Sequence, residues 1–156
     1  MMGTFFSRYK SIILGLFVFF IDFFTKRLAL DYCLMRCEIS QFLSFKISFN
    51  RGMTGSLFHT SNTLGFVLVT GMVIAITIGL SYYAYKRYVA GETIYGEVMV
   101  VAGSCSNILD RFVYGGVIDF IEVSYGQWMW PSFNFADASI VIGVGIMMMK
   151  HYKEGK

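Results

Sequence analysis

The sequence predicts an all-α polytopic membrane protein with four transmembrane helices, forming a single integral-membrane domain over residues 1–156. The first observation behind this prediction is composition: 56% of the residues are hydrophobic, 15% are charged and the mean hydropathy is +0.59. Soluble domains average roughly 45–50% apolar and about 25% charged residues, so this chain has too little polar surface to cover a globule in water. The second observation is that the apolar residues gather in four runs. A soluble enzyme is therefore not expected.

The four apolar runs approach the length of about 20 residues that a helix needs to cross a bilayer. The second run contains no Asp, Glu, Lys or Arg, whereas the first is interrupted by Asp22 and Lys26. The fourth run is short and has Asp137 at its start, so its first turn is expected to begin before the hydrocarbon layer. The predicted spans are residues 11–30, 63–85, 95–112 and 135–149.

Four crossings place both termini on the same side of the membrane. Seven Lys and Arg residues then lie on the side of the termini and six lie at or near the other side. The excess is small, but the short flanking segments, to which the positive-inside rule applies best, are the strongly basic ones. We therefore expect both termini in the cytoplasm, with residues 31–62 and 113–134 as the outer regions. Seven acidic residues fall on this outer half: Asp22, Asp31, Glu38, Asp110, Asp119, Glu122 and Asp137.

The two outer regions differ in their sequence patterns. Residues 41–50, QFLSFKISFN, alternate imperfectly and are rich in Phe and Ile, which predicts one or two short strands. Residues 114–134 contain Gly115, Gly116, Gly126 and two tryptophans, which predicts a loop at the membrane interface. Asp119 is expected in that loop, just after the third span.

Polar side chains at membrane depth need a partner or a function, because each costs roughly 2.5–3.5 kcal/mol on insertion scales. Asp22, Thr25 and Lys26 share one helix face at i, i+3 and i+4, with the acid before the base. A salt bridge at a helix end is one interpretation of this group, and participation in a buried site is the other.

The same spacing recurs at the outer end of the third span, where Asn107, Asp110 and Arg111 share a face. A cluster that satisfies its own hydrogen bonds is a simpler interpretation, but Asn107 lies a full turn deeper and brings both donors and an acceptor. Asn134 and Asp137 stand three residues apart at the start of the fourth span. Capping of the helix N-terminus would explain Asn134 but would leave Asp137 unexplained.

Packing of the first, third and fourth spans would gather these polar residues at one end of the helices. Two carboxyl groups that share a poorly hydrated site cannot both ionise easily, so one holds a proton while the other stays charged. The ionised group can then take a proton from water while the protonated one polarises a carbonyl group. The side chains that would meet are Asp22, Asn107, Asp110, Arg111, Asp119 and Asp137.

Other functions fit the pattern less well. A small helical transporter or channel that uses the aspartates as an ion path would distribute acids through the membrane depth, whereas these cluster at one end. A non-catalytic membrane subunit that grips a partner with its polar ends is a further alternative. The sequence has no HExxH motif and no spaced Cys/His group, so it does not predict a metal site. The scattered basic residues do not predict nucleic-acid binding.

Five segments in order along the chain resemble the motif set of lipoprotein signal peptidase, also called signal peptidase II. The NxxDR, VxDF and FNxAD series is the most specific part, and the resemblance covers nearly the whole chain. The matching segments are DFFTK (residues 22–26), NRG (50–52), GSCSNILDR (103–111), GGVIDF (115–120) and PSFNFADAS (131–139).

The resemblance implies an aspartic endopeptidase of the bacterial inner membrane, with its active site near the outer, periplasmic face. Such an enzyme removes the signal peptide from diacylglyceryl-modified prolipoproteins by cutting just before the lipidated cysteine, in contact with membrane lipids and without a metal or an organic cofactor. The matched motifs imply that Asp119 and Asp137 form the catalytic dyad. A small extracytoplasmic β-cradle and an outer helix or loop would flank the site.

The same matching assigns supporting roles to the remaining motif residues. Asn107 and Asn134 would hold the dyad by hydrogen bonds, and Arg111 would hold the substrate backbone or lipid groups. Asn50 and Gly52 would belong to a substrate-facing outer loop. Asp22 and Lys26 would organise the outer end of the first span, and Asp110 belongs to the same supporting group.

The chain departs from the family pattern at two places. Ser106 stands where the family usually has Gly, which adds a side chain where close helix packing is expected. The outer motif usually continues as NxGxAF, whereas Gly52 is followed here by Met53, Thr54 and Gly55. The second departure bears on the shape of the substrate-binding loop.

Overall fold

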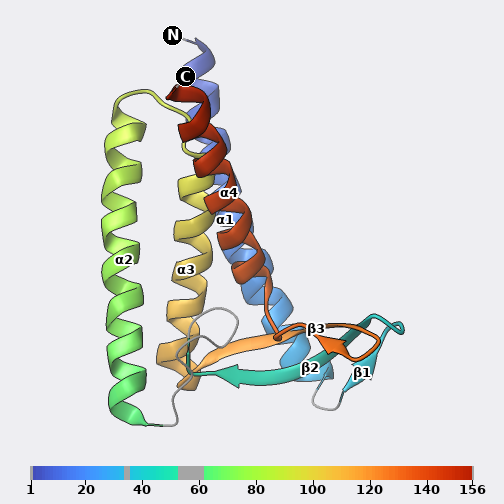
Figure 1. Cartoon of the computed structure of the whole chain (residues 1–156). Helices are drawn as coiled ribbons and strands as arrows, with labels where there is room; N and C mark the ends of the chain where they lie inside the picture. Colours follow the sequence, from blue (N-terminus) through green and yellow to red (C-terminus); the bar gives the residue numbers. More distant parts are fainter. Residues whose placement is uncertain (1, 34–35, 53–61, 156) are drawn as a thin grey trace.

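A computed structural model describes residues 2–33, 36–52 and 62–155 of the chain. Within these ranges it contains four helices and one antiparallel sheet of four strands. The sheet lies at one end of the helices (Figure 1). The elements in chain order are α1 (Met2–Tyr32), β1 (Cys37–Glu38), β2 (Leu43–Asn50), α2 (Thr63–Val89), α3 (Tyr95–Tyr114), β3 (Val117–Tyr125), β4 (Trp128–Met129) and α4 (Phe135–Glu154).

The helix α3 lies at the centre and packs against α1, α2 and α4. Glycines let α3 and α4 approach closely: a Cβ atom at Gly96 would lie 2.7 Å from the carbonyl oxygen of Gly143, and one at Gly103 would lie 2.7 Å from that of Ala136. Small residues at helix contacts are typical of membrane bundles. In Figure 1 the start of α1 and the end of α4 lie at the end of the helices opposite the sheet.

The four helices occupy the four predicted places, and three extend clearly beyond the predicted bounds. The helix α4 has 20 residues rather than the predicted 15, and α1 has 31. Of the helices in residues 2–155 that the structure describes, α2 is the one that is long and apolar enough to cross a membrane by length and composition. The other three carry acidic residues, including Asp22, Asp110 and Asp137, whereas α2 carries none.

The sheet contains one predicted strand, β2, and three strands that the sequence analysis missed, of which β3 is the longest. The strand predicted in residues 41–50 is confirmed as β2, Leu43–Asn50. The prediction of a loop throughout residues 114–134 is wrong, because β3 occupies Val117–Tyr125 and pairs with β2. The first five residues of β3 are all buried, so the alternation of polar and apolar residues that identifies a half-buried strand is absent there.

The pairing of β2 with β3 places the polar residues of the outer regions. Ser48 lies opposite Asp119, and Asn50 lies opposite Val117. Asp119 is thus held in a strand instead of the predicted loop. Gly115 ends α3 in the left-handed conformation, with φ of 69°, which lets the chain turn directly into β3.

Candidate active site

Asp119 is buried at the start of β3, with 1% of its surface exposed. Its two carboxyl oxygens accept hydrogen bonds from two amides: Asn50 Nδ2 donates to Oδ2 at 3.0 Å, and Asn134 Nδ2 donates to Oδ1 at 2.9 Å. Burial, followed by the nearby charge of Asp137, raises the pKa of Asp119 from 3.8 to about 7, although both amide donors and Lys26 oppose this shift. At neutral pH this carboxyl group therefore holds a proton for a large part of the time.

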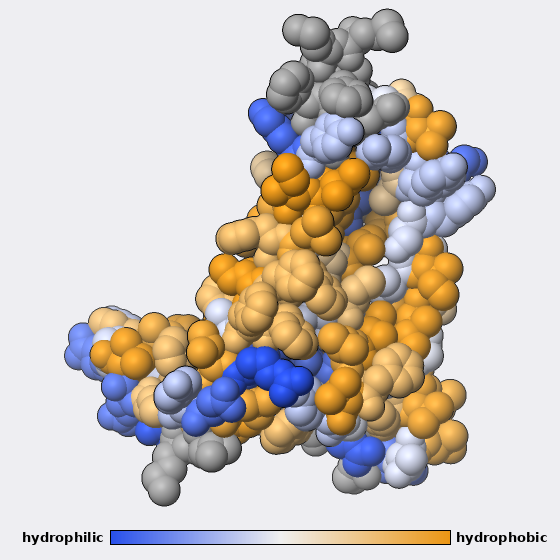
Figure 2. Space-filling model, turned by 180° about the vertical axis from the view of Figure 1, so that it is seen from behind, coloured by the Kyte–Doolittle hydropathy of each residue, from blue (hydrophilic) through white to orange (hydrophobic). Residues whose placement is uncertain are grey.

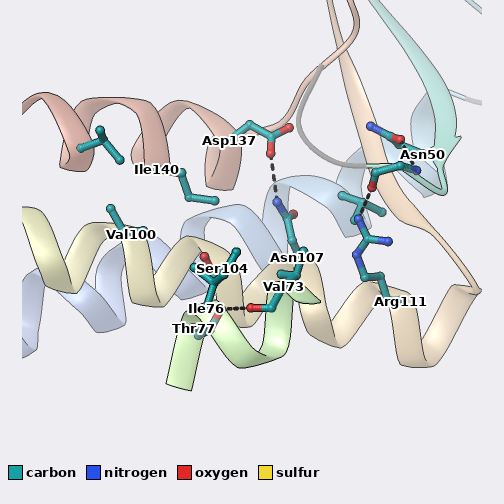
Figure 3. Close-up of a pocket in the computed structure, with 13 residues that line it drawn as sticks. Asn50, Val73, Ile76, Thr77, Val100, Ser104, Asn107, Arg111, Asp137 and Ile140 are labelled. Atoms are coloured by element: carbon teal, nitrogen blue, oxygen red, sulfur yellow. Dashed lines mark hydrogen bonds between the residues drawn. The ribbon is translucent and has the colours of Figure 1, made fainter. Parts of the chain in front are cut away.

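Asp137 lies in the first turn of α4, where the helix start itself fixes its side chain. Asn134 caps the helix: its Oδ1 accepts from the backbone N–H of Asp137 at 2.8 Å, and its own N–H donates to Asp137 Oδ2 at 3.4 Å. This reciprocal arrangement is a capping box. The remaining oxygen, Asp137 Oδ1, accepts from Asn107 Nδ2 at 3.0 Å (Figure 3).

Asn134 joins the two carboxyl groups. Its backbone and Oδ1 hold Asp137, while its Nδ2 donates to Asp119, to Asn107 Oδ1 at 3.2 Å and to the carbonyl of Ile118 at 3.1 Å. The residue is fully buried. Capping, which was the simpler interpretation of Asn134, is thus one part of its role in the structure.

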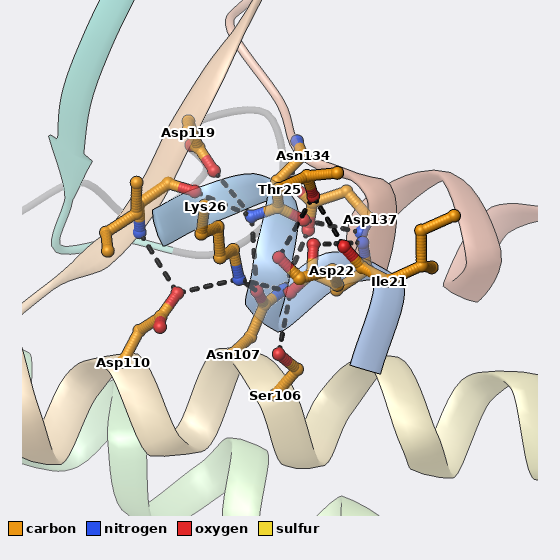
Figure 4. Close-up of polar contacts among 12 residues, drawn as sticks. Ile21, Asp22, Thr25, Lys26, Ser106, Asn107, Asp110, Asp119, Asn134 and Asp137 are labelled. Atoms are coloured by element: carbon orange, nitrogen blue, oxygen red, sulfur yellow. Dashed lines mark hydrogen bonds and ion pairs between the residues drawn. The ribbon is translucent and has the colours of Figure 1, made fainter. Parts of the chain in front are cut away.

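Lys26 provides a buried positive charge next to this pair (Figure 4). Its Nζ lies 2.6 Å from Asp22 Oδ2, 2.7 Å from Asp110 Oδ2 and 2.8 Å from Asn107 Oδ1, so all three ammonium hydrogens have acceptors. Asp110 also accepts from the N–H of Ile118 at 3.2 Å, at the start of β3. Lys26 therefore connects α1 with α3 and, through Asn107, with Asp137.

Ser106, which departs from the family pattern, is part of this network. Its hydroxyl donates to Asp22 Oδ2 at 2.6 Å, and the other oxygen of Asp22 accepts from the N–H of Ala136 at 2.8 Å. Asp22 thereby ties α1 and α3 to the first turn of α4, directly beside Asp137. The sequence analysis noted Ser106 only as added bulk, because a hydroxyl inside an apolar helix gives no signal of its partner.

Arg111 lies on the other side of the site, close to the end of β2. Its Nη2 donates to the carbonyl of Gly52, and the N–H of Gly52 donates to Asn50 Oδ1 at 2.8 Å. Nε and Nη1 of Arg111 are buried and have no hydrogen-bond partner among the residues that the structure describes. The guanidinium groups of Arg111 and Arg51 both lie over the ring of Phe66, at 5.7 and 4.9 Å from its centre.

A cavity of about 240 Å³ opens beside these groups between α2, α3 and α4 (Figure 3). One end is polar, and the other, along the helices, is mainly apolar with the hydroxyl groups of Thr77 and Ser104. The polar end is lined by Asn50, Asn107, Arg111 and Asp137, and the apolar end by Val73, Ile76, Val100, Ile140 and Val144.

All ten residues singled out in the sequence belong to one connected set of hydrogen bonds and ion pairs. Asn50 is the last residue of β2 rather than a loop residue, and it contacts Asp119 directly. The Met53–Thr54–Gly55 segment, whose sequence is unusual, lies outside the described residues. The ten are Asp22, Lys26, Asn50, Gly52, Asn107, Asp110, Arg111, Asp119, Asn134 and Asp137.

Comparisons with known proteins place the chain in a family. Residues 14–153 match the family model described as signal peptidase (SPase) II. The chain is 36% identical over 143 residues to the lipoprotein signal peptidase of Wigglesworthia glossinidia brevipalpis, a match that covers 89% of this chain and 92% of the relative. It is 34% identical over 139 residues to that of Aquifex aeolicus, which covers 86% and 81%.

Two solved structures share the fold, and both are described as bacterial membrane enzymes. One, at 22% identity, aligns with a TM-score of 0.75 over 94% of this chain and 90% of its own. The other, at 26% identity, aligns with a TM-score of 0.71 over 90% and 91%. With the family match along nearly its whole length, the chain belongs to the signal peptidase II family of bacterial membrane peptidases.

Proposed function

We propose that this protein is an aspartic endopeptidase that removes the signal peptide from diacylglyceryl-modified prolipoproteins, cutting just before the lipidated cysteine. The family membership supports prolipoprotein processing, and it leaves the transporter alternative without support. The observation that carries the aspartic mechanism is the placement of Asn134, which contacts both Asp119 and Asp137 within one buried site.

The two carboxyl groups divide the chemistry between them. Asp119, whose pKa is raised to about 7, donates its proton to the oxygen of the scissile carbonyl, while the ionised Asp137 takes a proton from the attacking water. The water oxygen bonds to the carbonyl carbon and forms a tetrahedral intermediate. The C–N bond then breaks, the amine of the lipidated cysteine takes the proton from Asp137, and Asp119 recovers its own from the intermediate.

The amide donors around Asp119 stabilise this step. As Asp119 loses its proton it becomes a carboxylate, and hydrogen bonds to a charged oxygen are stronger than those to a neutral one. Asn50 and Asn134 therefore stabilise the transition state more than the resting enzyme, which is the condition for catalysis. Two buried donor atoms of Arg111 have no hydrogen-bond partner among the described residues, which supports a role for Arg111 in holding the substrate backbone or lipid groups.

We further propose that the chain is one multi-pass domain, residues 1–156, whose four helices span the membrane. Exposed apolar side chains along α1 and α2 support this arrangement, including Ile13, Phe17, Leu68 and Ile78, each at least 60% exposed. Figure 2 shows hydrophobic residues over the helices between two more polar ends. Both termini would be cytoplasmic, with the dyad near the outer, periplasmic face.

The test is cleavage of a diacylglyceryl-modified prolipoprotein by purified variants. Asp119→Asn and Asp137→Asn should each abolish cleavage while the protein stays folded, and a chelator should have no effect on the wild type. Asp31→Asn is the matched control, because Asp31 is an exposed carboxylate near the end of α1. Normal cleavage by either dyad variant would remove the aspartic mechanism.

A further inference from the structure

A second cavity, of about 480 Å³, reaches Asp137 from the other face of α4. We call it the α4 outer groove. Apart from Asp137 it is formed by apolar and aromatic residues, and its volume lies within the ~300–1,000 Å³ typical of ligand pockets. Its other lining residues are Trp130, Pro131, Phe133, Ala138, Val141 and Ile142.

Helix geometry explains why one residue, Asp137, lines two cavities. Residues three and four apart share a helix face, so Ala138, Val141 and Ile142 form one face of α4. Ile140 lies on the face toward the first cavity. Asp137 stands at the boundary between these faces and lines both cavities. Asp137 is therefore the residue that the two cavities share.

The two cavities differ in what they can bind. The first has amide and guanidinium groups at its inner end, from Asn50, Asn107 and Arg111. Among the described residues that line it, the α4 outer groove has no amide or guanidinium side chain, and the indole N–H of Trp130 is its one side-chain donor. It is open at its side, where Trp130 is 65% exposed and Val141 64%. A peptide backbone needs hydrogen-bond partners when it leaves water, whereas an alkyl chain needs none.

We infer that the α4 outer groove holds an acyl chain of the substrate's diacylglyceryl group. The inference rests on the proposed function, which gives the substrate two apolar arms joined next to the scissile bond. One arm is the apolar segment of the signal peptide, and the other is the lipid on the residue just after the cut. The peptide arm fits the cavity with several polar donors, and the lipid arm fits the mainly apolar groove, so both arms reach the membrane from one reaction centre.

The third large apolar hollow does not fit this role. It has a volume of about 570 Å³ and lies between α1, α2 and α3, lined by residues such as Gly15, Ala84 and Val98. None of its lining residues belongs to the ten-residue site. A lipid bound there would not be joined to a scissile bond at Asp137.

Photo-crosslinking tests the inference with two synthetic lipidated prolipoprotein peptides. The first carries a diazirine in its acyl chain, and the second carries one in the apolar segment of its signal peptide. Wild-type protein is first given both peptides in the dark to establish that they are cleaved. Asp119→Asn, which is expected to bind without cutting, is then irradiated with each peptide, and the labelled residues are identified by mass spectrometry. A phospholipid with the same diazirine reports labelling by bulk lipid.

The acyl probe should label the α4 outer groove, at Trp130, Pro131, Val141 or Ile142, more strongly than the phospholipid does. The signal-peptide probe should label the first cavity, at Val73, Ile76 or Val144. In the Asp119→Asn background, Val141→Trp should fill the groove and remove the acyl labelling. Met149→Trp, at an exposed position on the same helix outside the groove, should leave it unchanged.

Two results would overturn the inference in distinguishable ways. If wild type cleaves both peptides but the acyl probe labels the first cavity, or only the positions that the phospholipid labels, the groove is not the lipid site and the proposed function stands. If a folded wild type cleaves neither peptide, the proposed function fails and the inference fails with it.

Discussion

Replacement of Asn134 by serine separates the two roles that the structure gives this residue. Serine is as good an N-cap as asparagine, so its hydroxyl should keep the hydrogen bond from the N–H of Asp137. It has no amide group, so the donors to Asp119, Asn107 and the Ile118 carbonyl are lost. We therefore expect Asn134→Ser to leave the start of α4 intact and to weaken catalysis.

The size of the effect follows from the bond to Asp119. That bond, 2.9 Å in length, strengthens as the carboxyl group ionises in the transition state. Hydrogen bonds to charged groups contribute about 1.5–3 kcal/mol, which corresponds to a loss of about 10- to 150-fold in kcat/KM. Since the Asn134 amide lowers the pKa of Asp119, its removal should raise that pKa above about 7 and move the alkaline limb of the pH profile to higher pH.

The assay is kcat/KM for a lipidated prolipoprotein peptide across pH, together with thermal unfolding of each variant. Asn134→Ala is the matched control, because it loses the cap as well and should unfold more easily by about 0.5–2 kcal/mol. Asn134→Ser with wild-type kcat/KM and an unmoved alkaline limb would refute the role of the amide. A loss of activity that only parallels a loss of stability would assign Asn134 to capping alone.

Lys26→Met should lower the free energy of unfolding by about 3–5 kcal/mol, because it leaves two buried carboxylates without their cation. Denaturant unfolding in detergent measures this change, and the control Lys46→Met, at an exposed position of β2, should change the free energy little. Ser106→Ala should cost about 1.5–3 kcal/mol through the lost bond to Asp22, and unfolding at wild-type denaturant concentrations would show that this bond contributes nothing. The raised pKa of Asp119 makes kcat/KM decline above about pH 7, and an activity that is constant to pH 9 would contradict its role as the acid. For the same reason, between about pH 4 and pH 7 the folded protein keeps a proton on Asp119 that the unfolded chain releases. The stability of wild type relative to Asp119→Asn should therefore fall by on the order of 4 kcal/mol as pH rises through this range. A difference in melting temperature that stays constant with pH would refute the pKa shift.

The helices and the polar side chains of α1, α3 and α4 that belong to the site could be predicted from the sequence because the signals are local, whereas Asn50 and Gly52 are implied only by the family resemblance. An apolar run without charges identifies α2, and polar residues at i, i+3 and i+4 identify the inward faces of α1 and α3. The spacing of Asn134 and Asp137 likewise predicts the start of a helix. Such patterns show which side chains share a helix face, and a polar side chain within an apolar run is easy to recognise.

The strand β3 and the partners of the polar residues could not be predicted, because they depend on tertiary packing. The buried half of β3, Val117–Ile121, has no alternation, and its flanking glycines resemble those of a loop. The contact of Asn50 with Asp119 arises from the register between β2 and β3. The bond between Ser106 and Asp22 joins residues 84 positions apart and exists because α1 packs on α3.

The most direct test of the account is cleavage of a lipidated prolipoprotein by wild type, Asp119→Asn, Asp137→Asn and Asp31→Asn, beside the same substrate without its lipid. We predict that wild type and Asp31→Asn cut only the lipidated substrate, with or without a chelator, and that neither dyad variant cuts it although both stay folded. Cleavage by a folded Asp119→Asn or Asp137→Asn variant, or loss of wild-type activity on chelation, would contradict the aspartic mechanism.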